Sequence, residues 1–167
     1  MEVDQVSSPG HLTRSDHDLA ERTAMIETTR WTDGFTHSQL ETLARYMESF
    51  EVDEGRTILA EGGRDGHMLL IVSGKLNVVK SDGHGDPKII ATIGPGRTFG
   101  EMSLFDGEPR SASAVAASKV TFLLLSRESF ERLIEMFPTL GVAIYAKLAK
   151  LLSQRLRQTT GRLIDHL

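Results

Sequence analysis

The chain has 167 residues, of which 40 % are hydrophobic and 25 % charged, and its formal net charge at pH 7 is −4. These values are ordinary for a soluble globular domain, and the negative charge gives no overall attraction to nucleic acid or to an anionic membrane. The absence of cysteine excludes disulfides, thiolate metal sites and iron–sulfur clusters. Without a signal-peptide pattern or an apolar run near the roughly 20 residues of a membrane span, we expect a cytoplasmic protein with no membrane partner.

Two helices are predicted in residues 16–50. Before them, residues 1–15 have few apolar side chains and include a Ser-Ser-Pro-Gly run, which predicts a disordered tail. Residues 16–30 contain good helix formers after a polar start. Thr36 to Gln39 fits a capping box, and a second helix is predicted from the apolar residues that follow at helical spacing, Leu40, Leu43, Ala44 and Met47.

Residues 51–126 consist of short apolar runs separated by turn residues. We expect strands over residues 56–60, 67–72, 75–80, 88–93, 113–117 and 120–125. Only Ser73-Gly74 separates the second run from the third, which predicts a hairpin. About seven short strands with frequent turns indicate an antiparallel roll or sandwich, a mainly β fold with flanking helices.

Residues 127–167 are predicted to form two C-terminal helices. Ser126 is a plausible N-cap for the first, and Pro138 ends it and opens the next. The last helix should run from about Thr139 toward Thr160 and stop at Gly161. Its apolar ridge can either cover the roll as a lid or form the seam of a homodimer. Its basic residues can form a solvated face, contact nucleic acid or bind an acidic partner.

One stretch, residues 98–112, combines the residue types that a nucleotide needs. Gly100 allows close approach of a backbone to a ligand, and Glu101 can accept hydrogen bonds from a pair of hydroxyls. Residues 102–105 can form one helical turn with free N–H groups. Arg110 offers a planar fork for a phosphate, and Ser111 adds a hydroxyl beside it. A carboxylate next to an arginine suggests binding of a ribose-phosphate.

The run FGEMSLFDGEPRSA, residues 99–112, resembles without a gap the phosphate-binding cassette of cyclic nucleotide-binding domains. The resemblance implies a double-stranded, jelly-roll-like β-roll that binds cAMP or cGMP. Glu101 would hold the ribose 2′-hydroxyl, Arg110 the cyclic phosphate, and Ser111 a phosphate oxygen or the base. The residues that would supply backbone N–H groups are Gly100, Met102, Ser103 and Ala112. The side chains of Phe99 and Met102 are expected to pack beneath the site.

The resemblance also sets expectations about the output of the protein. In the transcription-factor relatives, the long helix contacts the base and leads into a helix-turn-helix domain. The matching base position here is Arg155, and few residues follow the helix, so we expect no direct DNA binding. The leading interpretation is a non-enzymatic receptor that signals to an unknown effector protein. The alternatives are a β-roll interaction module that binds no ligand, or a regulator that acts through a separate DNA-binding chain.

The six histidines show no metal-binding spacing and are expected at the surface. A cupin barrel would place clustered His and Glu ligands on adjacent strands, and haem ligation by His67 or His84 has no supporting feature. No catalytic set competes with the cassette, because phosphodiester hydrolysis would need a metal cluster or a base–nucleophile pair. We therefore expect no cofactor other than the nucleotide ligand.

Overall fold

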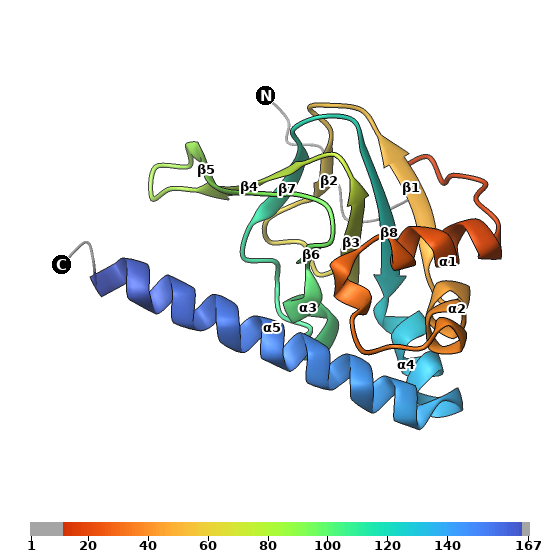
Figure 1. Cartoon of the computed structure of the whole chain (residues 1–167). Coiled ribbons are helices and arrows are strands. Elements are labelled where there is room, and N and C mark those ends of the chain that lie inside the picture. Colours follow the sequence, from red (N-terminus) through yellow and green to blue (C-terminus); the bar gives the residue numbers. More distant parts are fainter. Residues whose placement is uncertain (1–11, 165–167) are drawn as a thin grey trace. The chain divides into compact units, whose positions relative to one another are not determined.

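The computed structural model describes residues 12–164, with side chains through Gly161. Of these, residues 12–129 belong to one compact unit and residues 130–164 to a second. The predicted fold class is confirmed, because the first unit is an antiparallel β-roll and helices occur at both ends of the chain (Figure 1).

Eight strands in the described part of the chain form two antiparallel four-stranded sheets. In spatial order, the first sheet contains β1 (Glu48–Val52), β8 (Val120–Ser126), β3 (His67–Ser73) and β6 (Thr98–Phe99). The second sheet contains β2 (Thr57–Leu59), β7 (Ser113–Ala116), β4 (Leu76–Ser81) and β5 (Pro87–Ile93). The short β6 forms the first two residues of the stretch 98–112, so the first sheet fixes where the cassette begins.

The predicted hairpin between residues 67–72 and 75–80 is wrong. β3 pairs with β8 and β6, whereas β4 pairs with β7 and β5 in the other sheet. Gly74 lies between them with φ +82°, and a Cβ there would lie 2.2 Å from the carbonyl oxygen of Lys119. The left-handed backbone and this close approach require glycine, and they carry the chain from one sheet to the other.

The core of the roll is built from the inward-facing side chains of both sheets. The buried apolar cluster includes residues from β1, β2, β3, β4, β7 and β8. Within this cluster, Phe50 and Phe122 stack with ring centroids 5.6 Å apart. Burial of this apolar area is the main stabilising term for the unit.

Leu12 also belongs to this buried cluster. Arg14 forms an isolated bridge with Phe50, and the Ser15 N–H donates to the Ser49 carbonyl at 2.9 Å. The predicted disordered tail is therefore wrong for residues 12–15, because one apolar side chain in a polar segment is enough to anchor it. The prediction for residues 1–11 lies outside the described residues.

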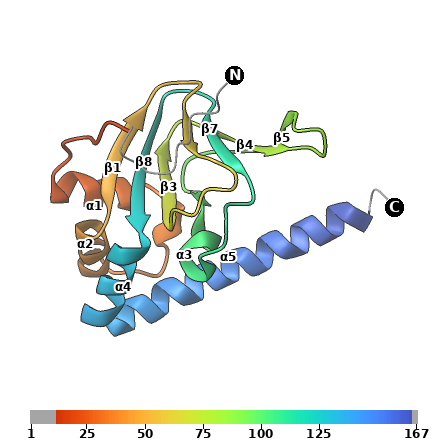
Figure 2. The ribbon, with the colours of Figure 1, turned by 180° about the vertical axis from the view of Figure 1, so that it is seen from behind.

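Three short helical elements precede the roll: α1 (Leu19–Glu27), the 3₁₀ turn η2 (Arg30–Thr32) and α2 (His37–Arg45). The predicted capping box of α2 is confirmed, with Thr36 and Gln39 bonding each other's backbone N–H groups. Arg22 of α1 donates from Nε to the Ala44 carbonyl of α2 at 3.2 Å, and the two helices lie side by side in both views (Figure 2). The predicted helical region was too long, because β1 begins at Glu48.

The C-terminal helices are α4 (Arg127–Met136) and α5 (Pro138–Ile164). The predicted cap is confirmed, since the Ser129 N–H donates to Ser126 Oγ at 3.1 Å. The predicted stop at Gly161 is wrong, and the helix continues to Ile164. The two helices pack closely, because a Cβ at Gly141 would lie 2.8 Å from Ile134 Cγ1.

Among residues 12–164, no helix has both the length and the apolar character that crossing a membrane requires.

Candidate phosphate-binding site

The cassette starts where β6 ends against β3. Phe99 and Thr98 are in register with Leu69 and Leu70, and the next residue, Gly100, caps the helix α3 (Glu101–Asp106) with φ +85°. A Cβ at Gly100 would lie 2.5 Å from both the His67 carbonyl oxygen and Arg110 Nη1. Position 100 therefore requires glycine for two reasons: its backbone is left-handed, and a side chain there would collide with Arg110 and with the backbone of His67.

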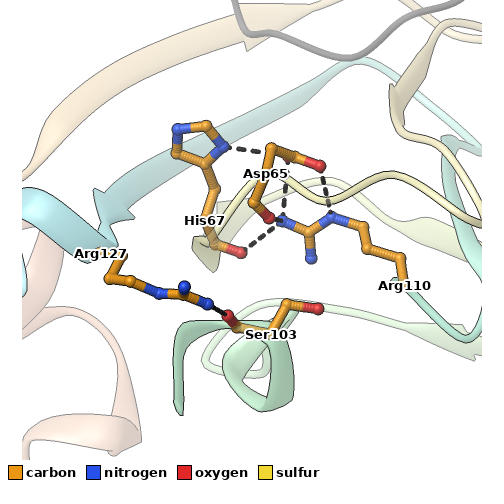
Figure 3. A network of polar contacts seen from close by, with 5 residues as sticks. All are labelled: Asp65, His67, Ser103, Arg110 and Arg127. Atoms are coloured by element: carbon orange, nitrogen blue, oxygen red, sulfur yellow. Dashed lines mark hydrogen bonds and ion pairs between the residues drawn. The ribbon is translucent and has the colours of Figure 1, made fainter. Parts of the chain in front are cut away.

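Arg110 is almost completely buried and is held by Asp65 of the β2–β3 loop and by His67, the first residue of β3 (Figure 3). Its Nε donates to Asp65 Oδ1 at 3.1 Å, and its Nη2 donates to Asp65 Oδ2 at 3.0 Å. Nη2 also donates to the carbonyls of Asp65 and His67, both at 2.8 Å. The sequence predicted that the planar guanidinium of Arg110 would bind a phosphate. In the structure, two of its nitrogens bind the carboxylate of Asp65 instead.

The remaining nitrogen, Arg110 Nη1, is the exception. It is buried and has no hydrogen-bond partner among the described residues. In Figure 3 it points away from Asp65, toward the side where Ser103 lies. A buried donor without a partner costs about 1–3 kcal/mol, and a cationic donor favours an anion. Nη1 of Arg110 is therefore an oriented, charged donor of the kind that favours an anion.

The β2–β3 loop also pairs with the backbone of Arg110. The Gly62 N–H donates to the Arg110 carbonyl, and the Arg110 N–H donates to the Gly63 carbonyl, each at 2.8 Å. Main chain and side chain of the arginine are consequently fixed by the same loop, so its guanidinium is oriented before any ligand arrives.

Asp65 and His67 were missed by sequence reasoning. His67 Nδ1 lies 3.0 Å from Asp65 Oδ2. Burial acts to raise the pKa of the Asp65 carboxyl, but the hydrogen bonds from His67 and Arg110 outweigh burial and hold this pKa below its ordinary value. Asp65 therefore stays ionised at neutral pH as the counter-ion of Arg110. A buried arginine needs such a partner, which was the available sequence signal, although nothing in the sequence says which acidic residue supplies it.

The other predicted cassette residues are placed along α3 and just after Arg110. Glu101, Ser103 and Ala112 are buried, while Ser111 is exposed. Met102 has 53 % of its surface exposed, so its predicted packing beneath the site is wrong. Phe99 does pack against the core of the roll. Contact of these residues with a ligand stays a prediction.

Two further features bear on the predicted site. Lys80 of β4, which sequence reasoning missed, donates from Nζ to the Ser111 carbonyl at 2.6 Å, so the second sheet also fixes the cassette.

Arg155 lies on α5 in the C-terminal unit, and its contact with the base remains a prediction. In the described part of the chain, no group of three His, Asp or Glu side chains is arranged to hold a metal ion.

Comparison with known proteins identifies relatives of this arrangement. Residues 49–137 match the family model described as "Cyclic nucleotide-binding domain". The structure of a cyclic nucleotide-binding domain from Methylobacillus flagellatus superposes with a TM-score of 0.78 at 31 % sequence identity. That match covers 89 % of this chain and 84 % of the other.

Two curated proteins are also similar in sequence. The cyclic AMP receptor protein of Thermus thermophilus is 34 % identical over 125 residues, which is 75 % of this chain. The CRP-like cAMP-activated global transcriptional regulator of Mycobacterium tuberculosis is 28 % identical over 132 residues, or 79 % of this chain. The aligned regions span only 56 % and 57 % of the lengths of these two relatives.

Proposed function

Because this chain belongs to the cyclic nucleotide-binding domain family, we propose that it is a receptor for a 3′,5′-cyclic mononucleotide. The observation that carries the proposal is the buried Nη1 of Arg110, which has no hydrogen-bond partner among residues 12–164, is oriented by Asp65 and lies against Gly100. A cyclic phosphate carries one negative charge and offers oxygens as acceptors, which suits a single charged donor.

The proposed ligand is oriented by the cassette. Glu101 accepts a hydrogen bond from the ribose 2′-hydroxyl, and Arg110 donates to the phosphate. The backbone N–H groups assigned to the phosphate and sugar are those of Gly100, Met102, Ser103 and Ala112. Arg155 is the candidate for base contact. The names of the Thermus and Mycobacterium relatives support cAMP over cGMP as the ligand.

The proposed output is conformational. Ligand binding supplies an acceptor to Nη1 of Arg110 and tightens α3, and the change reaches the C-terminal helices, which signal to a partner protein or to a second copy of the chain. Such a shift is limited by the difference in ligand affinity between the two states. The chain acts in this proposal as a receptor and not as a catalyst.

Isothermal titration calorimetry with cAMP and cGMP tests the proposal directly. We expect saturable heat with at least one of them, together with a rise in Tm, because a ligand that binds only the folded state stabilises it. 5′-AMP is the matched control, since it keeps the base and the ribose but has an open phosphate. Saturating cAMP and cGMP that change neither heat nor Tm would contradict the proposal.

Glu101→Gln is expected to reduce discrimination between ribose and deoxyribose ligands. A carboxylate is a stronger acceptor for the 2′-hydroxyl than an amide, by about 1 kcal/mol, so the affinity ratio of cAMP to 2′-deoxy-cAMP should fall about fivefold. The amide is nearly isosteric, which suits a buried position. Glu108→Gln, at an exposed cassette position, is the control and should keep the wild-type ratio. An unchanged ratio in Glu101→Gln would remove Glu101 from the sugar site.

Ser111→Ala is expected to show what the exposed hydroxyl recognises. In the syn orientation, the exocyclic amino group of guanine can donate to this hydroxyl, whereas adenine has no such group. If the hydroxyl serves the base, cGMP should lose about fivefold more affinity than cAMP, the scale of one neutral hydrogen bond. Titration of both ligands against both proteins measures this. Equal losses would assign the hydroxyl to the phosphate and leave base selection to the region of Arg155.

A further inference from the structure

Arg127, the first residue of α4, connects three segments of the first unit. Its backbone N–H donates to the Gly66 carbonyl at 2.7 Å. Its side chain reaches α3, where Nε donates to the Leu104 carbonyl at 3.3 Å and Nη2 donates to the Ser103 carbonyl (Figure 3).

These contacts supply hydrogen-bond donors to backbone carbonyls of α3 that have no partner within the helix. The last four carbonyls of a helix have no intrahelical partner, and in α3, which ends at Asp106, they include those of Ser103 and Leu104. A six-residue helix is also too short to be stable alone. A cation at its C-terminal end opposes the partial negative charge there. Arg127 thus stabilises the conformation in which α3 follows Gly100.

The side chain of Arg127 is enclosed by two residues that lack side chains. A Cβ at Gly66 would lie 3.0 Å from both Cβ and Nε of Arg127, and a Cβ at Gly107 would lie 3.0 Å from its Nη1. Gly66 directly follows Asp65, which orients Arg110, and Gly107 directly follows α3. One side chain is therefore in close contact with both segments that define the phosphate site.

We propose that Arg127 is a positioning residue, which holds α3 and the Asp65 loop in the geometry that binds ligand and couples both to the first turn of α4. The inference rests on the proposed function for its ligand. Any ligand that tightens α3 acts on the carbonyls of Ser103 and Leu104, and these carbonyls are bound by the side chain at the start of α4. The first turn of α4 therefore responds to occupancy through direct hydrogen bonds.

Arg127→Met tests this proposal, because it keeps an aliphatic stem beside Gly66 and removes the donors. By calorimetry, we expect the Kd for cAMP to rise about tenfold, the scale of losing a hydrogen bond from a charged donor. By hydrogen–deuterium exchange, ligand-free α3 should exchange faster than in the wild type. At saturating cAMP, the protection that ligand confers on the amides of residues 127–130 should be lost. Arg127→Lys should recover part of each effect.

Arg132→Met is the matched control, because Arg132 is an exposed arginine on the same helix, and it should behave as the wild type in all three measurements. Wild-type affinity in Arg127→Met would overturn the positioning role, and retained protection of residues 127–130 at saturation would overturn the coupling role. A wild-type protein that binds neither nucleotide would instead refute the proposed function. In that case, hydrogen–deuterium exchange of ligand-free α3 would still test whether Arg127 stabilises that helix.

Discussion

Replacing Arg110 by alanine is expected to weaken cyclic-nucleotide binding by about ten- to a hundredfold, the range expected for removing a charged donor. The same change should lower the Tm of the ligand-free protein, because it leaves the carboxylate of Asp65 without its counter-ion. Arg110→Lys should recover only part of the affinity and part of the Tm. A single ammonium cannot bind Asp65 through two parallel nitrogens and also donate to a ligand. Calorimetry and thermal unfolding measure the two effects separately.

Arg97→Ala is the control for this experiment, because Arg97 is an exposed arginine that directly precedes β6. It should leave affinity and Tm unchanged. The double variant Asp65→Asn/Arg110→Met removes both charges, so it should regain stability relative to Arg110→Ala without regaining binding. An Arg110→Ala protein that binds cAMP with wild-type affinity would show that the ligand contacts another part of the chain.

Asp65→Ala is expected to be the most destabilising single change in the loop. The two side chains of the ion pair are only 2 % and 9 % exposed, and removing one partner of a buried pair typically costs about 3–5 kcal/mol of unfolding free energy. Denaturant unfolding measures this loss. Saturating cAMP should offset part of it, because the phosphate supplies a negative charge to the same guanidinium. Asp53→Ala, at an exposed position, is the control.

The contribution of Asp65 should also depend on pH. Its pKa is lowered in the folded protein, so the stabilisation is present above its unfolded pKa of about 3.9 and is lost as the pH falls through the lower folded value. The difference in stability between wild type and Asp65→Ala should therefore be constant near neutrality and shrink below about pH 4. Equal stability of the two proteins at pH 7 would show that the ion pair contributes nothing to folding.

The elements of the roll could be predicted because their signals are local. Short apolar runs between turn residues, the capping box at Thr36 and the break at Pro138 each act within a few residues, and each appears in the structure. Strand pairing could not be predicted in the same way. Whether the chain turns back or crosses at Gly74 depends on the backbone of Lys119, which is remote in sequence.

The candidate site also contains residues that could be predicted from local sequence and residues that could not. The cassette residues were predicted because they are contiguous, whereas Asp65 and Arg127 come from segments before and after the cassette. Asp65 is one of 23 acidic residues, and its role follows from the Gly62–Arg110 and Gly63–Arg110 backbone pairing, which has no signature in residue type. Arg127 appeared in sequence as one more charged residue at the start of an amphipathic helix.

The engagement of Arg110 with Asp65 has a consequence for which phosphates the site admits. The ion pair sums to zero charge before any ligand binds, so an incoming monoanion makes this buried pair singly negative. A phosphomonoester, whose second pKa is about 6, carries close to two negative charges at neutral pH, and the charge it brings into a region of low polarisability exceeds what one nitrogen can compensate. In the proposed receptor, the carboxylate of Asp65 would therefore make Arg110 selective for the ring-closed diester over the product of its hydrolysis.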